Sequence, residues 1–498
     1  MISHKEDILN VGDSTFHESQ LEIFYDHQRN SDNPQYNVGG YIHMQGNLQV
    51  DAFKIANKIT LQSNDALSSK IVNISGEPTV LYGSYDSHDL ALLDYRSHHN
   101  SFEDAINWIK QEYNRPIDIM GNPLVKQALF RLADTQWIWV IKCHHIIIDG
   151  LGFVSLFNQL ADNYTSVVNK KSTEHYAFPS YRQEVISSKE YFCSEKYSRD
   201  KEYWQRKFEN VPEPIFRQRY GMNEISLLKQ SEQALTEQDN EVILKYSKLG
   251  FSIQQLFLTA LSIYLNRYSA NSDIVIGLPI HNRRNKHQKK TVGVLMSISP
   301  CLIRVSGDAS IAEHMALIKK IQREDYRHQK YPISHLYRNL NLLSNSRTRL
   351  FDATLNYDLF DFDLNFEAIS SQVVQVDSDY SSIPLGIRIS EYGDGRPTKV
   401  KLSTNLNYFS EKESDLILDQ LLSVFRQILS NDQSKICQLN IVSEVEKQIV
   451  LGQHKFVDSP RNNQCIHERF EAQVHAHPSA IALVYEDQSM TYLELNQR

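Results

Sequence analysis

The residues best suited to chemistry lie together in one short stretch, Cys143–Gly150, which reads CHHIIIDG. Imidazole is the side chain that exchanges a proton most readily near neutral pH. Consecutive side chains on an extended strand point to opposite faces, so His144 and His145 cannot both address one substrate. One of them should face a cavity while the other packs inside the protein. The same alternation argues against joint zinc ligation, since histidines that share a metal need skipped spacing.

An aspartate and two glycines follow the histidines. Asp149 followed by Gly150 suits a tight turn, in which the carboxylate could pair with a cation and hold the turn rigid. Gly152 would let the backbone approach a ligand closely, because glycine carries no side chain. A histidine at a strand end is often only a structural group. The spacing alone therefore leaves a catalytic and a structural role both open.

Apolar patterns on either side predict the elements that position this stretch. Trp137–Cys143 is apolar and contains β-branched residues, as expected of a buried strand. Phe153–Val168 has the spacing of a helix with one apolar face. Upstream, Gly39–Val50 alternates like a strand and Asp51–Leu61 has helical spacing. The histidines should therefore lie where a buried strand gives way to a loop and then a helix.

The second half of the chain also mixes the two kinds of element. Ser252 and Gln255 form a capping-box pattern before the apolar run Leu256–Leu265, which predicts a buried helix. Asp273–Gly277 predicts a buried strand that ends at a glycine and a proline, and Ser414–Leu429 predicts a closing helix. We therefore expect an α/β protein.

The length and composition limit the class of protein. A chain of 498 residues is too long for one compact core, so we expect at least two folding units. A bridge with two prolines, Asn210–Ile215, separates the two large stretches. Apolar residues make up 41% and charged residues 22%, which is typical of a soluble globular protein. The net charge of −8, with only a short basic cluster around Arg283, argues against a nucleic-acid partner.

Cysteine usage and hydropathy indicate the compartment. The five cysteines are scattered without paired ligand spacing, which fits a reducing cytoplasm better than a disulfide framework. The N-terminus has no apolar signal core, and no apolar run approaches the roughly 18 residues of a membrane span. We expect a cytoplasmic monomer without a membrane span.

The motif HHIIIDG resembles the HHxxxDG motif of nonribosomal peptide synthetase condensation domains, which have the chloramphenicol acetyltransferase-like fold. Further segments resemble other motifs of that family in the same order. They are Ser19–Phe24, Pro116–Leu124, Ile276–Pro279 with Arg283, Gly293–Pro300, Tyr326–Lys330 and Leu350–Asn356. These matches extend from roughly residue 15 to residue 445, so the resemblance covers nearly the whole chain.

This resemblance implies an α/β fold of two chloramphenicol acetyltransferase-like lobes, arranged as a V-shaped pseudo-dimer around a central active-site tunnel. The tail resembles the very start of an adenylation domain. The implied divisions are an N-terminal lobe (14–175), a connecting segment (176–215), a C-terminal lobe (216–445), a linker (446–464) and a truncated adenylation start (465–498).

The resemblance also implies roles for the motif residues. His145 matches the catalytic second histidine, either as a base or as a group that positions the amine and stabilises charge. Asp149 matches a structural aspartate expected to pair with Arg283, and Gly150 matches the motif glycine. His144 is expected to be mainly structural. Two positions depart from the family: Ser68 stands where an arginine is common, and Ser297 where an asparagine is common.

The implied reaction joins an acyl thioester to the amine of an amino acid held on the 4′-phosphopantetheine of an acceptor carrier domain. We expect no metal and no cofactor bound by the domain itself, and an adenylation domain fused downstream. If Met1 is the natural start, the donor must arrive in trans. Asn33–Val38 and Trp137–Trp139 resemble the starter subgroup and the enterobactin synthase domain. We favour a fatty acyl-CoA donor, and an aryl or peptidyl donor on a carrier protein, or a non-catalytic docking role, stays open.

Overall fold

The structure is a computed structural model of the whole chain. It describes residues 15–83, 90–171, 178–221, 225–342, 347–360, 362, 364–393, 395–442, 446–448, 451, 465–486 and 488–498. The chain divides into two compact units, residues 1–441 and 442–498. The predicted boundary between residues 175 and 176, and most of the predicted linker 446–464, lie outside the described residues.

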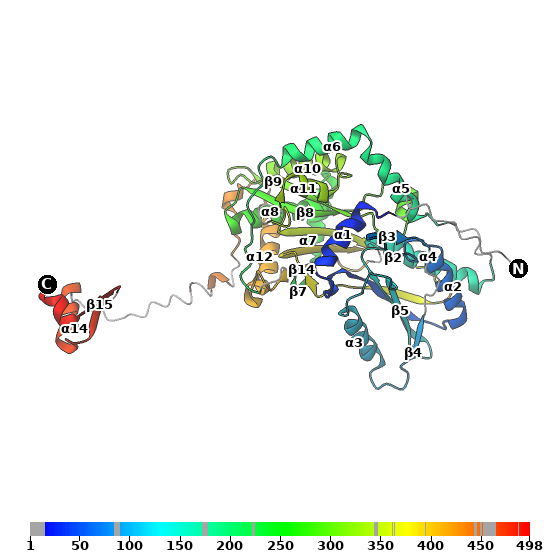
Figure 1. Cartoon of the computed structure of the whole chain (residues 1–498), viewed down its shortest axis with the longest axis horizontal. Coiled ribbons are helices and arrows are strands. Elements are labelled where there is room, and N and C mark those ends of the chain that lie inside the picture. The colour runs from blue at the N-terminus through cyan, green and yellow to red at the C-terminus, as the bar shows by residue number, and fades with distance from the viewer. Residues whose placement is uncertain are drawn as a thin grey trace. The chain divides into compact units, whose positions relative to one another are not determined.

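A five-stranded sheet dominates the first half of the larger unit, with strand order β11-β1-β6-β5-β4 (Figure 1). Its strands are β1 (Asn37–Gln45), β4 (Ala91–Asp94), β5 (Val125–Ala133), β6 (Gln136–His144) and β11 (Ser370–Val376). The helices of this half are α1 (Glu18–Arg29), α2 (Val50–Gln62), α3 (Ser101–Tyr113) and α4 (Gly150–Val168). A short helix η2 (Pro34–Tyr36) precedes β1, and a hairpin of β2 (Lys70–Ile74) and β3 (Glu77–Leu81) follows α2.

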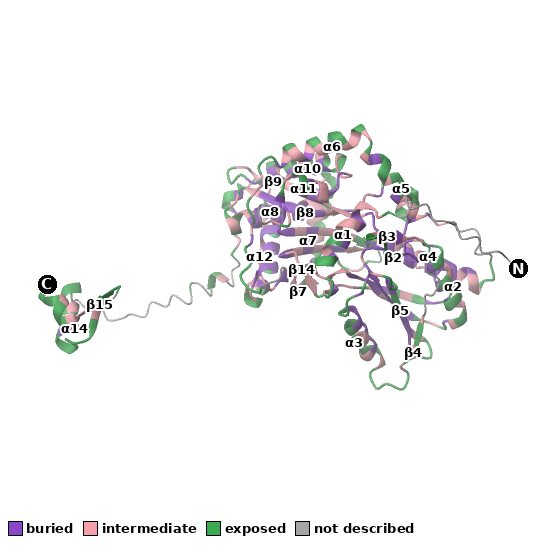
Figure 2. Cartoon of the chain, viewed as in Figure 1, coloured by how far each residue is buried: buried purple, intermediate pink, exposed green. Residues whose placement is uncertain are grey.

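Strand β6 is mostly apolar and is buried from Trp137 to His144, because both faces of this sheet are covered. Trp139 and Ile141 pack with residues of α2 and α4 in one core cluster. Ile138 and Val140 point the other way and pack against α3. Figure 2 shows β5, the neighbour of β6 in this sheet, largely in the purple of buried residues. The buried strand predicted at Trp137–Cys143 and the helix predicted at Phe153–Val168 are confirmed.

A seven-stranded sheet with order β12-β7-β14-β13-β10-β8-β9 forms the second half of this unit. Its strands are β7 (Ser226–Ala234), β8 (Asp273–Ile280), β9 (Ser297–Arg304), β10 (Ala353–Phe360), β12 (Tyr380–Ser381), β13 (Leu385–Tyr392) and β14 (Lys399–Asn405). Its helices are α7 (Glu237–Lys248), α8 (Ile253–Ser269), α9 (Lys286–Lys290), α10 (Ile311–Arg327), α11 (Ile333–Asn339), α12 (Glu411–Ser430) and the short η4 (Ile436–Gln438).

Local signals explain several of these elements. The predicted capping box is present: the Ser252 hydroxyl accepts from the Gln255 N–H, and the Gln255 side chain accepts from the Ser252 N–H, at the start of α8. The prediction that β8 ends at Gly277 was wrong, since the strand continues to Ile280. Beyond Gly277, β8 still pairs with β9 but no longer with β10. Pro279 has no backbone N–H, and on the β10 side there is no hydrogen bond of the sheet for it to make.

Two features lie between or across the halves. The predicted connecting segment forms two helices, α5 (Tyr181–Phe192) and α6 (Glu195–Lys207), capped by the hydroxyls of Ser180 and Ser194. The bridge at 210–215 contains neither helix nor strand. Strand β11, which follows β10 in the sequence, leaves the second half and pairs antiparallel with β1 of the first sheet. The predicted lobes, 14–175 and 216–445, are continuous ranges, so they assign β11 to the second half although it pairs in the first sheet.

The smaller unit contains α14 (Ile466–Ala476), a hairpin of β15 (Ile481–Tyr485) and β16 (Gln488–Thr491), and α15 (Tyr492–Gln497). Among its described residues, Val474 alone is buried.

Candidate active site

His144 is the last residue of β6 and is 1% exposed. The Ile146 N–H donates to its Nδ1 at 3.2 Å, so the ring proton lies on Nε2 and is donated to Nδ1 of His27, also at 3.2 Å. Burial, followed by the neighbouring rings of His27 and His145, holds the pKa of His144 well below its usual value. His144 is therefore a neutral, doubly bonded ring inside the first half.

His145 begins the loop after β6 and is only partly buried. Its N–H donates to the carbonyl of Tyr36 at 2.8 Å, which fixes the backbone against η2. Its Nδ1 lies 2.9 Å from the carbonyl oxygen of Ile148. A carbonyl can only accept, so Nδ1 carries the proton and Nε2 of the neutral ring has a free lone pair. The two histidines thus lie in different environments, as the alternation of the strand predicts.

Asp149 joins the two halves of the larger unit. Its Oδ1 accepts from the Gly152 N–H at 2.9 Å and caps α4. Its Oδ2 accepts from Arg283 Nη1 at 2.7 Å and from the N–H groups of Leu295 and Met296 at 3.0 and 3.1 Å. Burial would raise the pKa of Asp149, but the Arg283 guanidinium and these N–H donors hold it below its usual value.

Arg283 is equally enclosed, with side chains of both partners about 1% exposed. Besides the carboxylate, it donates through Nη2 to the carbonyl of Gly293 at 3.1 Å and through Nε to that of Gln288 at 3.0 Å. The ion pair expected from the sequence is present. It fastens the start of α4 to the loop between β8 and β9.

Two expectations for the motif glycines were wrong. Asp149 and Gly150 form the start of helix α4 instead of a tight turn, because the Asp149 carboxylate satisfies a free N–H of the first helical turn. A Cβ on Gly150 would meet nothing within 4 Å. A Cβ on Gly152 would lie 2.9 Å from Ile148 and 3.3 Å from the backbone of Gly293, so the close approach is to the chain itself and not to a ligand.

Gln20 of α1 is a supporting residue that sequence reasoning did not single out for a role, although it lies in the quoted segment Ser19–Phe24. Its Nε2 donates to the carbonyl of Ile146 at 2.9 Å. Its Oε1 accepts from the Tyr82 hydroxyl at 2.9 Å and from the His17 N–H at 3.0 Å. The buried amide thereby holds the loop that carries His145 against α1.

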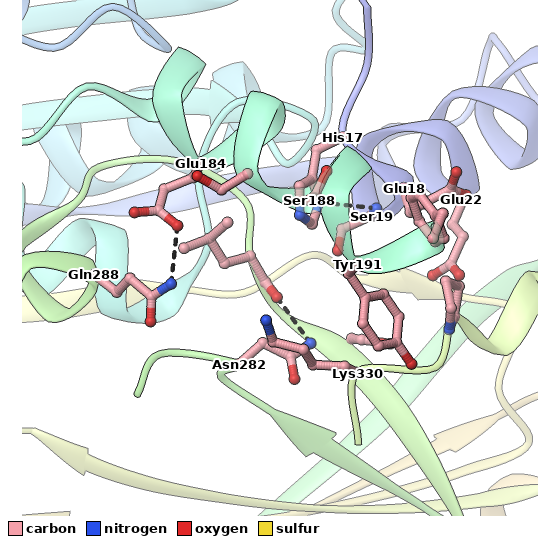
Figure 3. A pocket seen from close by; sticks show the side chains of 15 residues that line it. His17, Glu18, Ser19, Glu22, Glu184, Ser188, Tyr191, Asn282, Gln288 and Lys330 are labelled. Carbon is pink, nitrogen blue, oxygen red and sulfur yellow. Dashed lines mark hydrogen bonds between the residues drawn. The ribbon is translucent and has the colours of Figure 1, made fainter. Parts of the chain in front are cut away.

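A partly open pocket with a cavity volume of about 90 Å³ lies next to this cluster (Figure 3). Leu295, whose N–H binds Asp149, is one of its lining residues, whereas His145 is not. Polar and charged side chains predominate: its lining is His17, Glu18, Ser19, Glu22, Glu184, Ser187, Ser188, Tyr191, Phe192, Asn282, Gln288, Leu295, Ser297, Lys330 and Pro332. Figure 3 shows Glu18 and Glu22 of α1 opposite Glu184 of α5 and Gln288.

The two departures from the family pattern have different surroundings. Ser68 is buried, and its hydroxyl donates to the carbonyl of Leu61 at 3.0 Å, so it caps the end of α2. Ser297 lines the pocket. Only the second position is therefore placed to contact a ligand of this pocket.

Residues 13–451 match the family model of the condensation domain, so the chain belongs to the condensation domain family. It is 24% identical over 480 residues to a dimodular nonribosomal peptide synthase of Bacillus subtilis (strain 168), covering 96% of this chain and 20% of that protein. It is also 24% identical to surfactin synthase subunit 1 of the same organism, covering 88% and 12%. The chain thus spans a fifth or less of these curated relatives.

Solved structures agree with this assignment. The starter condensation domain of rhizomide synthetase in complex with C8-CoA matches with a TM-score of 0.77 at 21% identity, covering 86% of this chain and 97% of that one. The first condensation domain of the calcium-dependent antibiotic synthetase, in complex with a substrate analogue, matches with a TM-score of 0.74 at 17% identity, covering 86% and 99%. The predicted α/β fold of two chloramphenicol acetyltransferase-like lobes is confirmed.

Members of this family catalyse amide bond formation. Within the described ranges, no three or more histidine, cysteine, aspartate or glutamate side chains gather into a possible metal site. No helix in the described part of the chain is both long and apolar enough to cross a bilayer.

Proposed function

We propose that this chain is a starter condensation domain, which joins an acyl group from fatty acyl-CoA to the amine of an amino acid on a carrier domain. The observation that carries the proposal is the tautomer of His145. With Nδ1–H donated to Ile148, Nε2 is left as a hydrogen-bond acceptor. The likeness to a starter domain in complex with C8-CoA supports the choice of donor.

In the proposed reaction, Nε2 of His145 accepts a hydrogen bond from the acceptor amine and orients its lone pair. An α-amine has a pKa of about 8, so a useful fraction is neutral at physiological pH and no strong base is required. The amine nitrogen attacks the thioester carbonyl, and the C–N bond forms. Nε2 takes a proton from the nitrogen of the tetrahedral adduct, the C–S bond breaks, and the proton passes to the thiolate of coenzyme A. The products are the amide and free coenzyme A.

The other residues have supporting roles in this proposal. Asp149 and Arg283 hold the start of α4 and the loop around Gly293 together, so they position the site and transfer no proton. His144 fixes the end of β6. The acceptor carrier domain is the proposed partner, with its amino acid on 4′-phosphopantetheine. Residues 465–498 are proposed as the beginning of an adenylation domain fused downstream of this domain.

The test is an intact-mass assay on an aminoacyl carrier protein incubated with this chain and a panel of acyl-CoA thioesters. We expect a mass gain of one acyl group, and a loss of at least about 100-fold in rate for His145→Ala with unchanged thermal stability. If product forms only from an aryl or peptidyl donor on a second carrier protein, the proposed acyl-CoA donor is wrong. Product formation that survives His145→Ala, or absence of product from every donor, would contradict the catalytic proposal and favour a docking role.

A further inference from the structure

The pocket beside Asp149 carries charges of both signs, and its carboxylates already have partners. Gln288 Nε2 donates to Oε2 of Glu184 at 2.9 Å, and the Ser334 N–H donates to Oε1 of Glu22 at 3.1 Å. Burial raises the pKa of Glu22 to about 7, so this carboxyl group is about half protonated in neutral solution and mostly uncharged in slightly acidic solution. The negative charge of the pocket is thus partly neutralised before any ligand enters.

Lys330 differs from these groups. It is the single lysine or arginine among the described residues that line the pocket. Its Nζ lies 5.6 Å from the centre of the Tyr191 ring, and no described residue forms a hydrogen bond or ion pair with it. Burial, followed by the charges of Arg284 and Lys196, lowers the pKa of Lys330. A partly buried ammonium group without an acceptor is stabilised by an anionic ligand.

The remaining lining restricts what that ligand can be. Glutamates, serines and amide side chains surround the pocket, and burying them against an alkyl chain would leave polar groups without water. An acyl chain is therefore a poor occupant. An amino acid with an acidic side chain fits this lining, because its side-chain carboxylate suits Lys330 and its amine is left for Nε2 of His145.

We propose that this pocket receives the acceptor amino acid and that Lys330 selects an acidic side chain, that of aspartate or glutamate. The inference rests on the proposed function, because it takes the second substrate to be a carrier-bound amino acid. The pocket adjoins Asp149, at the end of the loop that carries His145, through Leu295, which lines the pocket and donates its N–H to Asp149. Lys330 is a specificity residue in this proposal and takes no part in bond formation.

Direct binding tests the pocket without requiring turnover. The probes are aminoacyl pantetheine amides, with nitrogen in place of the thioester sulfur, that carry aspartate, glutamate, asparagine, glutamine or leucine. Calorimetry on the full chain should give the acidic probes about 10- to 100-fold tighter binding than asparagine or glutamine, as expected of one charge-assisted hydrogen bond. Lys330→Met should abolish that difference, and Lys330→Glu should reverse it. Lys189→Met, an exposed lysine of α5 outside the pocket, is the matched control and should leave it unchanged.

The same probes with a 4′-phosphate separate two sources of anionic oxygen. If Lys330→Met weakens every phosphorylated probe equally and no probe without phosphate, the lysine binds the phosphate and side-chain selection is wrong. If neither set changes, the pocket proposal is wrong altogether. A wild-type chain that prefers the acidic probes but forms no amide from any donor would sustain this inference while contradicting the proposed reaction.

Discussion

Asp149 satisfies four donors at once through two oxygens that are almost completely buried: one guanidinium N–H and three backbone N–H groups, one of them in the first turn of α4. Two of those N–H groups belong to Leu295 and Met296, more than 140 positions along the chain. Geometry of this kind makes the residue a structural requirement of the site as well as a neighbour of His145.

Asp149→Asn should lower the free energy of unfolding by about 3–5 kcal/mol, since the amide would leave the Arg283 charge buried without its partner. Because the pKa of Asp149 is depressed, its stabilisation is present above the unfolded pKa of about 4 and is lost as pH falls through the lower folded value. The difference in free energy of unfolding between wild type and Asp149→Asn should therefore be constant from pH 5 to 8 and become smaller in stronger acid. Urea denaturation measures it, with Asp51→Asn on the exposed first turn of α2 as the control. Equal stability of Asp149→Asn and wild type would contradict the structural role.

Glu22 has the opposite linkage, because its folded pKa is raised. Both states are protonated well below pH 4.5, and the unfolded state ionises first as pH rises, so the wild type loses stability between about pH 4.5 and 7. Glu22→Gln removes this dependence and still accepts the Ser334 N–H. The variant should gain up to about 3 kcal/mol over wild type by pH 8 and none at pH 4. Denaturation at several pH values checks this, with exposed Glu190→Gln as the control; a gain that does not vary with pH would refute the linkage.

At the scale of elements, β6 is held by a buried lysine. Lys142 donates through Nζ to the carbonyls of Glu112 and Arg115, at 2.5 and 2.7 Å, and lies 3.2 Å from Oε1 of Glu112. The ammonium therefore binds one carbonyl in the last turn of α3, that of Glu112, and one just beyond the helix, that of Arg115. The side chain is 2% exposed, and this burial lowers the pKa of Lys142 although the Glu112 carboxylate opposes the shift.

Lys142→Met should cost about 2–4 kcal/mol, because the carbonyls and the Glu112 carboxylate lose a buried donor. Lys126→Met is a matched control: Lys126 also pairs with Glu112, at 3.4 Å, but its side chain is 52% exposed. That variant should change stability by less than about 1 kcal/mol. Urea midpoints of the two variants make the comparison, and equal losses would show that burial of Lys142 contributes nothing.

Several elements were predictable because their signals are local. The capping box of α8 and the apolar run of β6 lie within a few residues, so period and caps sufficed. The continuation of β8 through Pro279 could not be predicted, since it depends on which strand pairs with β8 there. The His144–His145 contrast followed from the pleat, whereas the N–H donors of Leu295 and Met296 have no signature in residue type. The Asp149–Arg283 pair was reached only through the resemblance to the family.

At the scale of the whole molecule, the two compact units differ greatly in their cores. The larger one contains extended apolar clusters on both sheets. In the smaller one, the described residues Ile481, Leu483 and Tyr485 of β15 are all more than half exposed. A hairpin of two strands with so little burial is at best marginally stable in water.

A chain ending at Ile441 should therefore keep the melting temperature of the full chain within about 2 °C, and the isolated segment 442–498 should lack a cooperative unfolding transition. Calorimetry of the three proteins tests both statements. A drop of 5 °C or more in the shortened chain would mean that the smaller unit stabilises the larger one.

The strand exchange between the halves was beyond sequence reasoning for a physical reason. β11 pairs with β1 so that Val376 lies opposite Gly39, and contacts between residues so far apart in the sequence leave no periodic pattern in either segment. Val373 of β11 and Ile369, just before the strand, join the core of the first half, so the exchange also contributes to burial there.

This exchange has a consequence for how the protein is made. A ribosome adding about 5–20 residues per second needs roughly 20 to 70 s to advance from β1 to β11. During that interval one edge of β1 has no strand beside it, and unpaired edges invite association with other chains. The first half therefore cannot complete its sheet while it emerges, and its final strand arrives only after most of the second half has been synthesised.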